Sequence, residues 1–348
     1  MISIYSGINH IADNVTDLFE WKANNKTGFR IHLAARLNGA PHLGTLINFA
    51  TGFVLAFRLS GLYGKPSRIC VDLIDNISDP NQSKTLDYNG RIYFYKRSVN
   101  DNPVLRKNQD RFVSLLDKLS VISGVGYEIH NYQDIQADVS VRKGIIDVIN
   151  DSDYFGHLFQ PSDKKLHCRV PCPVCGLTEK TVADTEIVSK SDRELLMRGR
   201  CPEHGTFETL FTPDNDSYMD INIPFRNFCK GLSVVDEDAA RNTMSILVRG
   251  NDWSGIWPLR IYCEGLMRLN RKALPNFLFS PLVLHNGEKL SKSRISGSDL
   301  LDQIVDTSLL PLEQMKALVE ETGCWLDDTD RFFTNYAINY FDGILKHE

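Results

Sequence analysis

The sequence lacks the features that mark secreted, membrane-spanning and strongly basic proteins. It does not open on a basic segment followed by an apolar one, and its longest apolar runs, such as Phe53–Phe57, are far too short to cross a bilayer. No dense block of lysine and arginine appears, and the formal net charge is −5. Because proteins that hold long nucleic acids usually carry a basic stripe, a large RNA-binding surface is not expected. We expect a cytoplasmic protein with no membrane partner.

A disulfide framework is also not expected, although the chain holds eight cysteines. Cys70, Cys229, Cys263 and Cys324 are scattered in apolar surroundings, which is typical of buried free thiols in a reducing compartment. The composition, with 42% hydrophobic and 24% charged residues, is that of an ordinary globular protein. A length of 348 residues allows two domains or one large domain with an insertion.

Strand and helix patterns alternate near both ends of the chain. Residues 28–35 form a β-prone run, apolar residues recur at helical spacing from Leu43 to about Ser60, and residues 68–73 form a second buried strand. Strand, glycine turn, helix and strand make the opening unit of a doubly wound α/β fold with parallel strands. The pattern resumes with strands predicted at Met244–Arg249 and Phe277–Leu284.

The middle of the chain is less regular. Residues 81–102 are polar and aromatic without a clear period and are interpreted as an insertion or a long loop. Helices are predicted at Leu105–Ile122 and Ile135–Ile149, with a strand at Gly126–His130 between them. From about residue 157 to residue 220 the composition shifts to cysteine, proline and charged residues, which indicates an inserted subdomain.

A phosphate-binding turn is predicted in the segment PHLGT, residues 41–45. Gly39, Pro41 and His42 lie where a strand gives way to a helix, whose free N–H groups and positive dipole end suit phosphate oxygens. The His42 ring can donate a hydrogen bond to the same phosphates. Gly44 has no side chain, so a purine or ribose can approach the backbone. The other interpretation is a plain Pro/Gly turn with a surface histidine.

A second polar segment, KLSKS at residues 289–293, directly follows a predicted strand. On a loop, Lys289 and Lys292 can neutralise charge on a triphosphate as pyrophosphate leaves, which accelerates the reaction most if it acts in the transition state. Ser291 and Ser293 add hydrogen-bond donors. The other interpretation is a solvated Lys/Ser surface loop.

A metal site is predicted between the two segments. Cys172 and Cys175 form one knuckle, and Cys201 and His204 form a second one, each with proline after its first ligand and glycine after its last. Three thiolates and an imidazole in tetrahedral geometry make a closed structural zinc site, with no position left for a catalytic water. Cys168 is an alternative to His204 as the fourth ligand, and free buried thiols without metal are the other interpretation.

These segments carry a resemblance to a known family. PHLGT resembles the HIGH signature of class I aminoacyl-tRNA synthetases, KLSKS resembles their KMSKS signature, and the cysteine-rich insertion resembles their connective peptide, especially that of class I lysyl-tRNA synthetase. The likeness spans roughly residues 28–300. It implies ATP-dependent activation of an amino acid to an aminoacyl-adenylate with help from Mg²⁺ and release of pyrophosphate. His42 and Lys292 would stabilise the α-phosphate, assisted by Lys289.

The resemblance also implies contacts for ATP and the amino acid. VRGNDWSG at residues 248–255 resembles a stretch in which Gly250 and Asp252 would contact the ATP ribose. Asp72 and Asp75 follow the second strand, where this class often places an acid that holds the substrate ammonium, and Trp253 would line the amino-acid pocket. Turn formation by the acids and core packing of the tryptophan are the other interpretations. Thr45 replaces the last histidine of the signature, and Gly39, Gly44, Ser291 and Ser293 complete the expected ATP contacts.

The expected organisation has four parts, in a Rossmann-like fold of the HUP type. They are the first half of the catalytic domain (1–155), a zinc-binding connective insertion (156–225), the second half with the KLSKS loop (226–297) and a short helical tail (298–348). A lysyl-type enzyme carries a large helical anticodon-binding domain after KLSKS and a tryptophan-rich segment where residues 219–231 lie here. We therefore expect a truncated paralogue without anticodon reading.

Three functions follow from this layout. The first is activation of an amino acid and its transfer to a non-standard acceptor, such as a small molecule, a carrier protein or a tRNA acceptor end. The second is lysyl-type charging of tRNA without an anticodon domain of its own. The third is a non-catalytic RNA-binding or regulatory relic, which would not need to keep His42, Gly44, Lys289 and Lys292. The amino acid and the oligomeric state are left open.

Overall fold

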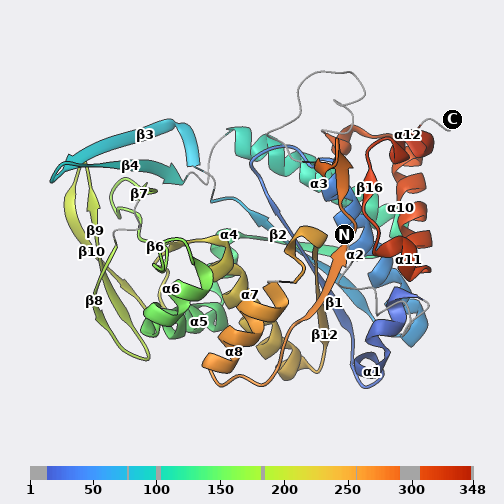
Figure 1. Cartoon of the computed structure of the whole chain (residues 1–348), viewed down its shortest axis with the longest axis horizontal. Coiled ribbons are helices and arrows are strands. Elements are labelled where there is room, and N and C mark those ends of the chain that lie inside the picture. Colours follow the sequence, from blue (N-terminus) through green and yellow to red (C-terminus); the bar gives the residue numbers. More distant parts are fainter. Residues whose placement is uncertain are drawn as a thin grey trace.

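A computed structural model describes residues 14–76, 78–98, 103–181, 185–255, 257–290 and 306–345 (Figure 1). Three predicted site residues, Ser291, Lys292 and Ser293, lie outside the described residues. The fold subdivides into a central sheet with its helices, an inserted all-β region beside it, and a set of C-terminal helices on the opposite side (Figure 1).

A five-stranded parallel sheet forms the centre. Its strands are β1 (Phe29–Arg36), β2 (Ser67–Ile74), β5 (Tyr127–Asn131), β12 (Met244–Gly250) and β13 (Asn276–Ser280). They lie side by side in the order β13-β12-β1-β2-β5, and every neighbouring pair is parallel. The strand order reverses between β1 and β12, as in doubly wound sheets. The predicted α/β fold with a parallel sheet is confirmed.

One face of this sheet is apolar. Ile31 and Leu33 on β1 and Val71 on β2 are fully buried in a hydrophobic cluster with helices α2 (Leu43–Tyr63), α3 (Pro103–Ser123) and α10 (Leu312–Leu326). By length and composition alone α2 could cross a membrane, but 67% of its most apolar window is buried inside the fold. The helix is apolar because it packs against strands on one side and against α3 and α10 on others.

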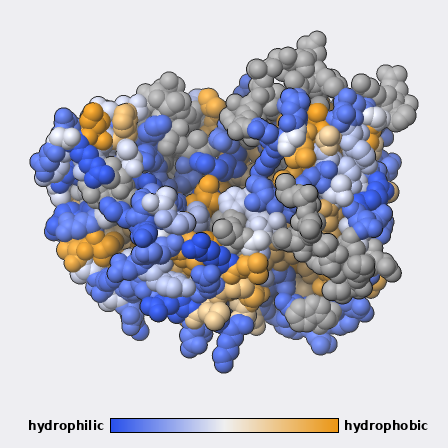
Figure 2. Space-filling model, viewed as in Figure 1, coloured by the Kyte–Doolittle hydropathy of each residue, from blue (hydrophilic) through white to orange (hydrophobic). Residues whose placement is uncertain are grey.

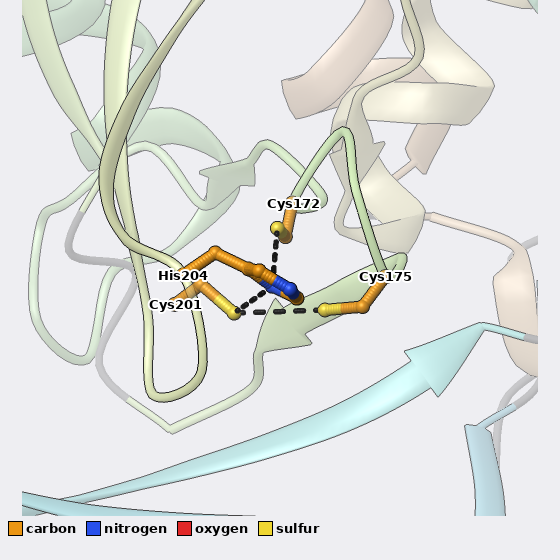
Figure 3. Close-up of side chains that lie close together, drawn as sticks. All are labelled: Cys172, Cys175, Cys201 and His204. Atoms are coloured by element: carbon orange, nitrogen blue, oxygen red, sulfur yellow. Dashed lines mark hydrogen bonds between the residues drawn. The ribbon is translucent and has the colours of Figure 1, made fainter.

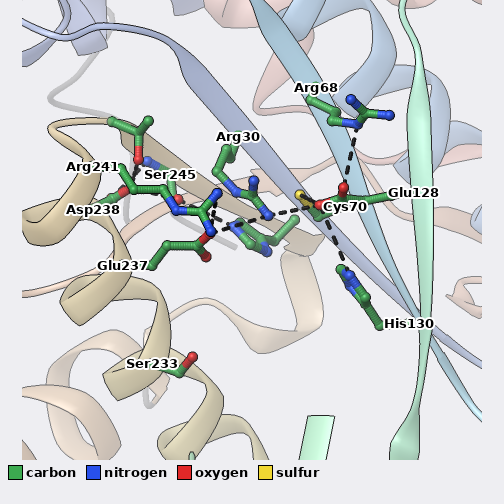
Figure 4. A network of polar contacts seen from close by, with 12 residues as sticks. Arg30, Arg68, Cys70, Glu128, His130, Ser233, Glu237, Asp238, Arg241 and Ser245 are labelled. Carbon is green, nitrogen blue, oxygen red and sulfur yellow. Dashed lines mark hydrogen bonds and ion pairs between the residues drawn. The ribbon is translucent and has the colours of Figure 1, made fainter. Parts of the chain in front are cut away.

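The opposite face of the same sheet is polar, which is unusual for a buried surface. His32 of β1, Asp72 of β2 and Ser245 of β12 are each at most 3% exposed and face helix α7 (Ile223–Arg241). Buried polar groups are costly unless they find partners, and α7 supplies some of them. Its Asp238 accepts hydrogen bonds from the backbone N–H and the hydroxyl of Ser245, both at 2.8 Å (Figure 4). Its Lys230 lies 3.5 Å from Asp72.

Residues 81–102, interpreted from sequence as an insertion or a long loop, are largely a β-hairpin, so the loop alternative is wrong. Strands β3 (Ser78–Tyr88) and β4 (Arg91–Ser98) pair antiparallel around Asn89 and Gly90, which have φ values of 53° and 73°. Asn-Gly is the favoured pair for a two-residue hairpin turn because both positions need a positive φ. The hairpin extends to the inserted region, where β4 pairs with β7 (Leu177–Glu179) (Figure 1).

The inserted region contains short strands in small sheets. These strands are β6 (Cys168–Arg169), β8 (Glu186–Lys190), β9 (Leu195–Cys201), β10 (Gly205–Phe211) and β11 (Asp220–Ile221). β8, β9 and β10 form one antiparallel sheet, and β6 pairs with β11. Helices α4 (Tyr132–Ala137), α5 (Val139–Asn150) and α6 (Ser152–Phe159) connect the central sheet to this region.

The strand predicted at Phe277–Leu284 is two strands in different sheets. β13 ends at Ser280, and β14 (Val283–His285) pairs with β15 (Glu288–Lys289) and β16 (Tyr336–Ala337). Pro281 separates the two because proline removes a backbone donor from the ladder. Lys289, predicted on a loop, therefore lies on a short strand.

Short helical elements complete the described fold. They are η2 (Val15–Phe19), α1 (Glu20–Ala23), η3 (Asn251–Trp253), the π-helical η4 (Trp257–Glu264), α8 (Gly265–Arg268), η5 (Thr307–Leu309), α11 (Thr329–Phe332) and α12 (Tyr340–Leu345). The face of the molecule shown in Figure 2 is mostly hydrophilic, with hydrophobic residues in small separate groups.

Candidate active site and metal centre

A cleft of about 470 Å³ lies at the carboxyl ends of β1 and β12, where the strand order reverses. Ligands of open α/β sheets bind at this kind of position. Seven of the predicted site residues line the cleft, although they come from three distant parts of the sequence. They are His42, Gly44, Thr45, Gly250, Asp252, Trp253 and Lys289.

The start of α2 lines one part of the cleft through His42, Gly44 and Thr45. His42 is the residue before the first helical residue, with an extended backbone at φ −89° and ψ 170°, and its side chain makes no capping hydrogen bond. The helix N-terminus therefore points its first N–H groups and its positive dipole end at the cleft. Thr307 stabilises the turn before α2, because its N–H and its hydroxyl both donate to the Pro41 carbonyl at 2.8 Å.

Gly44 is required by the position of the His42 ring. A Cβ atom at residue 44 would lie 3.1 Å from Cε1 and 3.2 Å from Nδ1 of His42. These contacts are tighter than normal, so the ring would have to shift by a few tenths of an ångström. The absence of a side chain at Gly44 therefore leaves room for the His42 ring in its present position.

We expect Gly44→Ala to lower amino-acid-dependent ATP–pyrophosphate exchange by about tenfold, because small displacements of a catalytic group are costly. The melting temperature should not fall, since alanine favours a helix over glycine by about 1 kcal/mol. Gly61→Ala on the same helix is the matched control, because nothing lies within 4 Å of its added Cβ. Equal exchange in the two variants would contradict this role for Gly44.

Lys289 and Asp252 form an ion pair across the mouth of the cleft. The Lys289 ammonium donates to Asp252 at 2.5 Å, and the two side chains are 47% and 31% exposed. Pairs this open to solvent contribute little to stability. Breaking this ion pair would therefore cost little free energy, so both side chains can change partners.

A second cavity of about 140 Å³ adjoins the cleft. The two share Ala34, Ala35, Arg36, Arg249 and Trp253 in their walls, so Trp253 stands between them. Asp72 lines only the second cavity and is 3% exposed. Asp72, predicted to contact the amino acid, thus lies in a cavity beside the cleft that holds most of the predicted nucleotide contacts.

The charge of Asp72 is balanced by two neighbours. Burial alone would raise the pKa of this carboxyl, but Lys230 at 3.5 Å and His130 at 3.8 Å outweigh it, and the net pKa lies below its ordinary value. The same contact raises the pKa of His130. Asp72 is therefore a carboxylate at neutral pH, as binding of a substrate ammonium would require.

Two other predicted residues, Asp75 and Gly39, do not line either cavity. Asp75 accepts a hydrogen bond from the Tyr132 backbone N–H at 3.1 Å, at the start of α4, and burial raises its pKa. In this position the Asp75 carboxylate stabilises the start of α4. Sequence reasoning also missed cavity residues, chiefly Asn48, whose amide donates to the Ser280 hydroxyl at 2.9 Å, and the cations Arg36, Arg226, Lys230 and Arg249.

The predicted metal ligands are brought together in the inserted region. Ligand atoms of Cys172, Cys175, Cys201 and His204 all lie within 4.8 Å of one another (Figure 3). The Cys175 and Cys201 sulfurs are 3.6 Å apart, and His204 Nδ1 is 3.6 Å from both Cys172 and Cys201. Cys168 belongs instead to an apolar cluster with residues such as Ile221.

These distances fit zinc. With Zn–S of about 2.3 Å and Zn–N of about 2.0 Å, tetrahedral ligand atoms lie about 3.5–3.8 Å apart. The two knuckles come from the segment before β7 and from the β9–β10 turn, so a shared ion would join strands of two sheets. Buried Tyr93 and Tyr95 of β4 pack in the same cluster as Cys172 and Cys201. The donor set is that of a closed structural site.

No family model and no curated protein matches this chain. Among solved structures 108 chains match. One is the glutamate-tRNA synthetase from Elizabethkingia anophelis, at a TM-score of 0.33 and 15% identity over 76% of this chain and 53% of that one. Another is a glutamate tRNA ligase from Elizabethkingia meningosepticum in complex with its amino acid, at 0.33 and 14% over 76% and 52%.

A third structure, from Campylobacter jejuni and assigned as an arginyl-tRNA synthetase, has a TM-score of 0.34 and 11% identity over 90% of this chain and 68% of that one. The chain spans about half the length of the two glutamate-tRNA enzymes that it matches. Similarity at these identities and TM-scores does not assign a function to this chain.

Proposed function

We propose that this protein activates an amino acid with ATP, forming an aminoacyl-adenylate and releasing pyrophosphate. The observation that carries this proposal is the single cleft lined by the PHLGT turn, the Gly250–Trp253 segment and Lys289. Its volume of about 470 Å³ falls within the usual range for ligand sites, about 300–1,000 Å³. The adjoining cavity with Asp72 supplies a place for the amino acid.

The chain's own groups would act by position and charge. ATP phosphates would lie at the α2 N-terminus, with His42, Lys289 and Lys292 stabilising the pentacoordinate α-phosphate. Asp252 would meet the ribose. Mg²⁺ usually binds one or two carboxylates together with substrate phosphates, and Asp252 is the one carboxylate among the described residues of the cleft. The amino-acid carboxylate is the nucleophile, so the protein needs no covalent nucleophile.

Amino-acid-dependent ATP–pyrophosphate exchange tests this function directly. We expect exchange above background with at least one amino acid in a broad panel without tRNA. No exchange with any amino acid, with or without added tRNA, would reject adenylation and favour a binding-only relic. Exchange that appears only with tRNA would indicate a tRNA-charging enzyme.

The acceptor of the activated amino acid is proposed to be non-standard, namely a small molecule, a carrier protein or a tRNA acceptor end. Transfer of radiolabelled amino acid to total tRNA, compared with transfer to small-molecule nucleophiles, separates these acceptors. Lysyl-type charging would be supported if tRNA became labelled with radioactive lysine and with no other amino acid of the panel. We also propose a structural zinc ion and a cytoplasmic location.

Lys292→Ala is expected to lower exchange by more than tenfold while leaving zinc content and melting temperature unchanged, because its charge would act mainly in the transition state. Lys316→Ala, at an exposed position on α10, is the control for loss of one positive charge. Unchanged exchange in Lys292→Ala would refute the role predicted for this residue.

A further inference from the structure

The second cavity has an excess of positive charge. Its walls contain four cationic side chains, from Arg36, Arg226, Lys230 and Arg249, and one carboxylate among the described residues, Asp72. The remaining walls are mainly apolar, from residues such as Ile74, Ile135 and Ile223. Arg36 and Arg249 also line the nucleotide cleft, whereas Arg226 and Lys230 do not. Arg226 and Lys230 are therefore the two cations of the second cavity that the nucleotide cleft does not share.

Arg226 and Lys230 lie one turn apart on α7 but differ in their partners. Lys230 is 3.5 Å from Asp72 and so is neutralised. Arg226 is 7% exposed, and its guanidinium lies 5.5 Å from the centre of the Tyr132 ring. Buried charges in proteins normally have a counter-ion, and burial lowers the pKa of this arginine.

Asp220, an acid that shares a cavity with Arg226, already has partners of its own. Asp220 lines a neighbouring cavity with Arg226, but one of its oxygens pairs with Lys180 and the other accepts from the Asn76 amide at 3.1 Å. No described carboxylate lies within ion-pair distance of the Arg226 guanidinium. A buried, planar guanidinium with no described carboxylate at ion-pair distance is well suited to a ligand carboxylate, which it can bind through two parallel hydrogen bonds.

The size of the cavity limits what it can hold. At about 140 Å³ it has room for roughly five water molecules, each taking about 30 Å³. That suits a small side chain and excludes a nucleotide. A basic side chain would place another positive charge beside Arg226, and such like-charge contacts oppose binding.

We infer that the amino acid activated by this protein carries a second carboxylate, which the second cavity binds through Arg226. The inference rests on the proposed function and names its substrate class, an α-amino dicarboxylic acid. Asp72 is the group for the substrate ammonium, Arg226 is the group for the distal carboxylate, and the α-carboxylate is directed past Trp253 towards the nucleotide cleft. This assignment departs from lysine, the substrate implied by the lysyl-type layout.

The test compares acids with their neutral isosteres in the full-length protein. In exchange assays over a panel with aspartate, glutamate, asparagine, glutamine and lysine, we expect an acidic amino acid to have at least a tenfold higher kcat/KM than its amide. In calorimetry with the same amino acids and no ATP, we expect saturable binding of the acid and none of its amide. The calorimetric measurement does not depend on adenylation.

Arg226→Gln should raise the KM for the acidic amino acid at least tenfold and leave the KM for ATP within twofold. Arg226→Lys, which keeps the charge, should recover part of the loss. Arg241→Gln is the matched control, since Arg241 lies on the same helix, is 63% exposed and pairs with Glu237 at 3.3 Å. Zinc content and melting temperature verify that each variant is folded.

The outcomes separate this inference from the function on which it rests. Exchange with a neutral or basic amino acid but not with an acidic one overturns the inference and leaves adenylation standing. Absence of all exchange, together with calorimetric binding of an acid that Arg226→Gln abolishes, rejects adenylation and supports the cavity assignment. Wild-type protein that binds no dicarboxylic amino acid in either assay overturns the inference.

Discussion

Replacing His42 with alanine is expected to lower amino-acid-dependent ATP–pyrophosphate exchange by about a hundredfold, the usual effect of losing one donor to a transition-state charge. The His42 ring lines the cleft at the N-terminus of α2, where the phosphates are proposed to lie. If the imidazole binds the α-phosphate more strongly as it becomes pentacoordinate, the loss falls mainly on kcat.

The fold should tolerate this change. The His42 side chain makes no capping hydrogen bond to α2, so its removal takes no stabilising cap from the helix. His157→Ala is a suitable control, because His157 is exposed on α6 and its ring lies 2.8 Å from the Asp153 carbonyl. Exchange by His42→Ala within threefold of the control, at equal melting temperature, would remove His42 from the proposed chemistry.

Cys172→Ser is expected to reduce bound zinc from about one ion per chain towards zero, because a hydroxyl is a much poorer zinc ligand than a thiolate. Structural zinc contributes on the order of 10 kcal/mol to small metal-dependent folds, so the inserted region should lose order. Atomic emission gives the zinc content, and hydrogen exchange should show lost protection in β7, β9 and β10.

The central sheet is expected to survive this substitution, because its apolar face packs with α2, α3 and α10 and includes no metal ligand. Protection in β1 and β12 should therefore change little. Cys324→Ser controls for loss of a thiol, because Cys324 on α10 is exposed and not buried as predicted. Full zinc content in Cys172→Ser would show that the four side chains do not form the proposed site.

The central sheet was predictable because its strands are continuous apolar or alternating runs. Their local preference for strand agrees with their tertiary contacts. β12 differs from its predicted range by one residue, and β2 by one at each end. The helix predicted over 135–149 is divided at Asp138, whose carboxylate caps α5 by accepting from the Ser140 and Val141 N–H groups. Because an aspartate can also occur within a helix, hydrophobic periodicity alone does not reveal that the helix is divided at Asp138.

The cleft was easier to predict from the sequence than the second cavity. Residues of PHLGT and the Gly250–Trp253 segment are predicted because each motif lies within a few residues of a strand end. The second cavity is assembled from β1, β2, α4, α7, β12 and η3, and of its residues only Asp72 and Trp253 were predicted from sequence. The spacing of Arg226 and Lys230 by four residues is a sequence signal that these two cations share a face of α7.

The pairing of β4 with β7 has a consequence for the order of folding. It brings Tyr95 opposite Glu179, so a long stretch of chain must close before the two strands meet. Loop closure over such separations makes folding slow, whereas the β3–β4 hairpin and the β9–β10 turn need only local contacts. We expect these hairpins to form first. The pairing of β4 with β7, next to the Cys172–Cys175 knuckle, should form late. Zinc added during refolding should then accelerate a slow phase and leave the earliest phase unchanged.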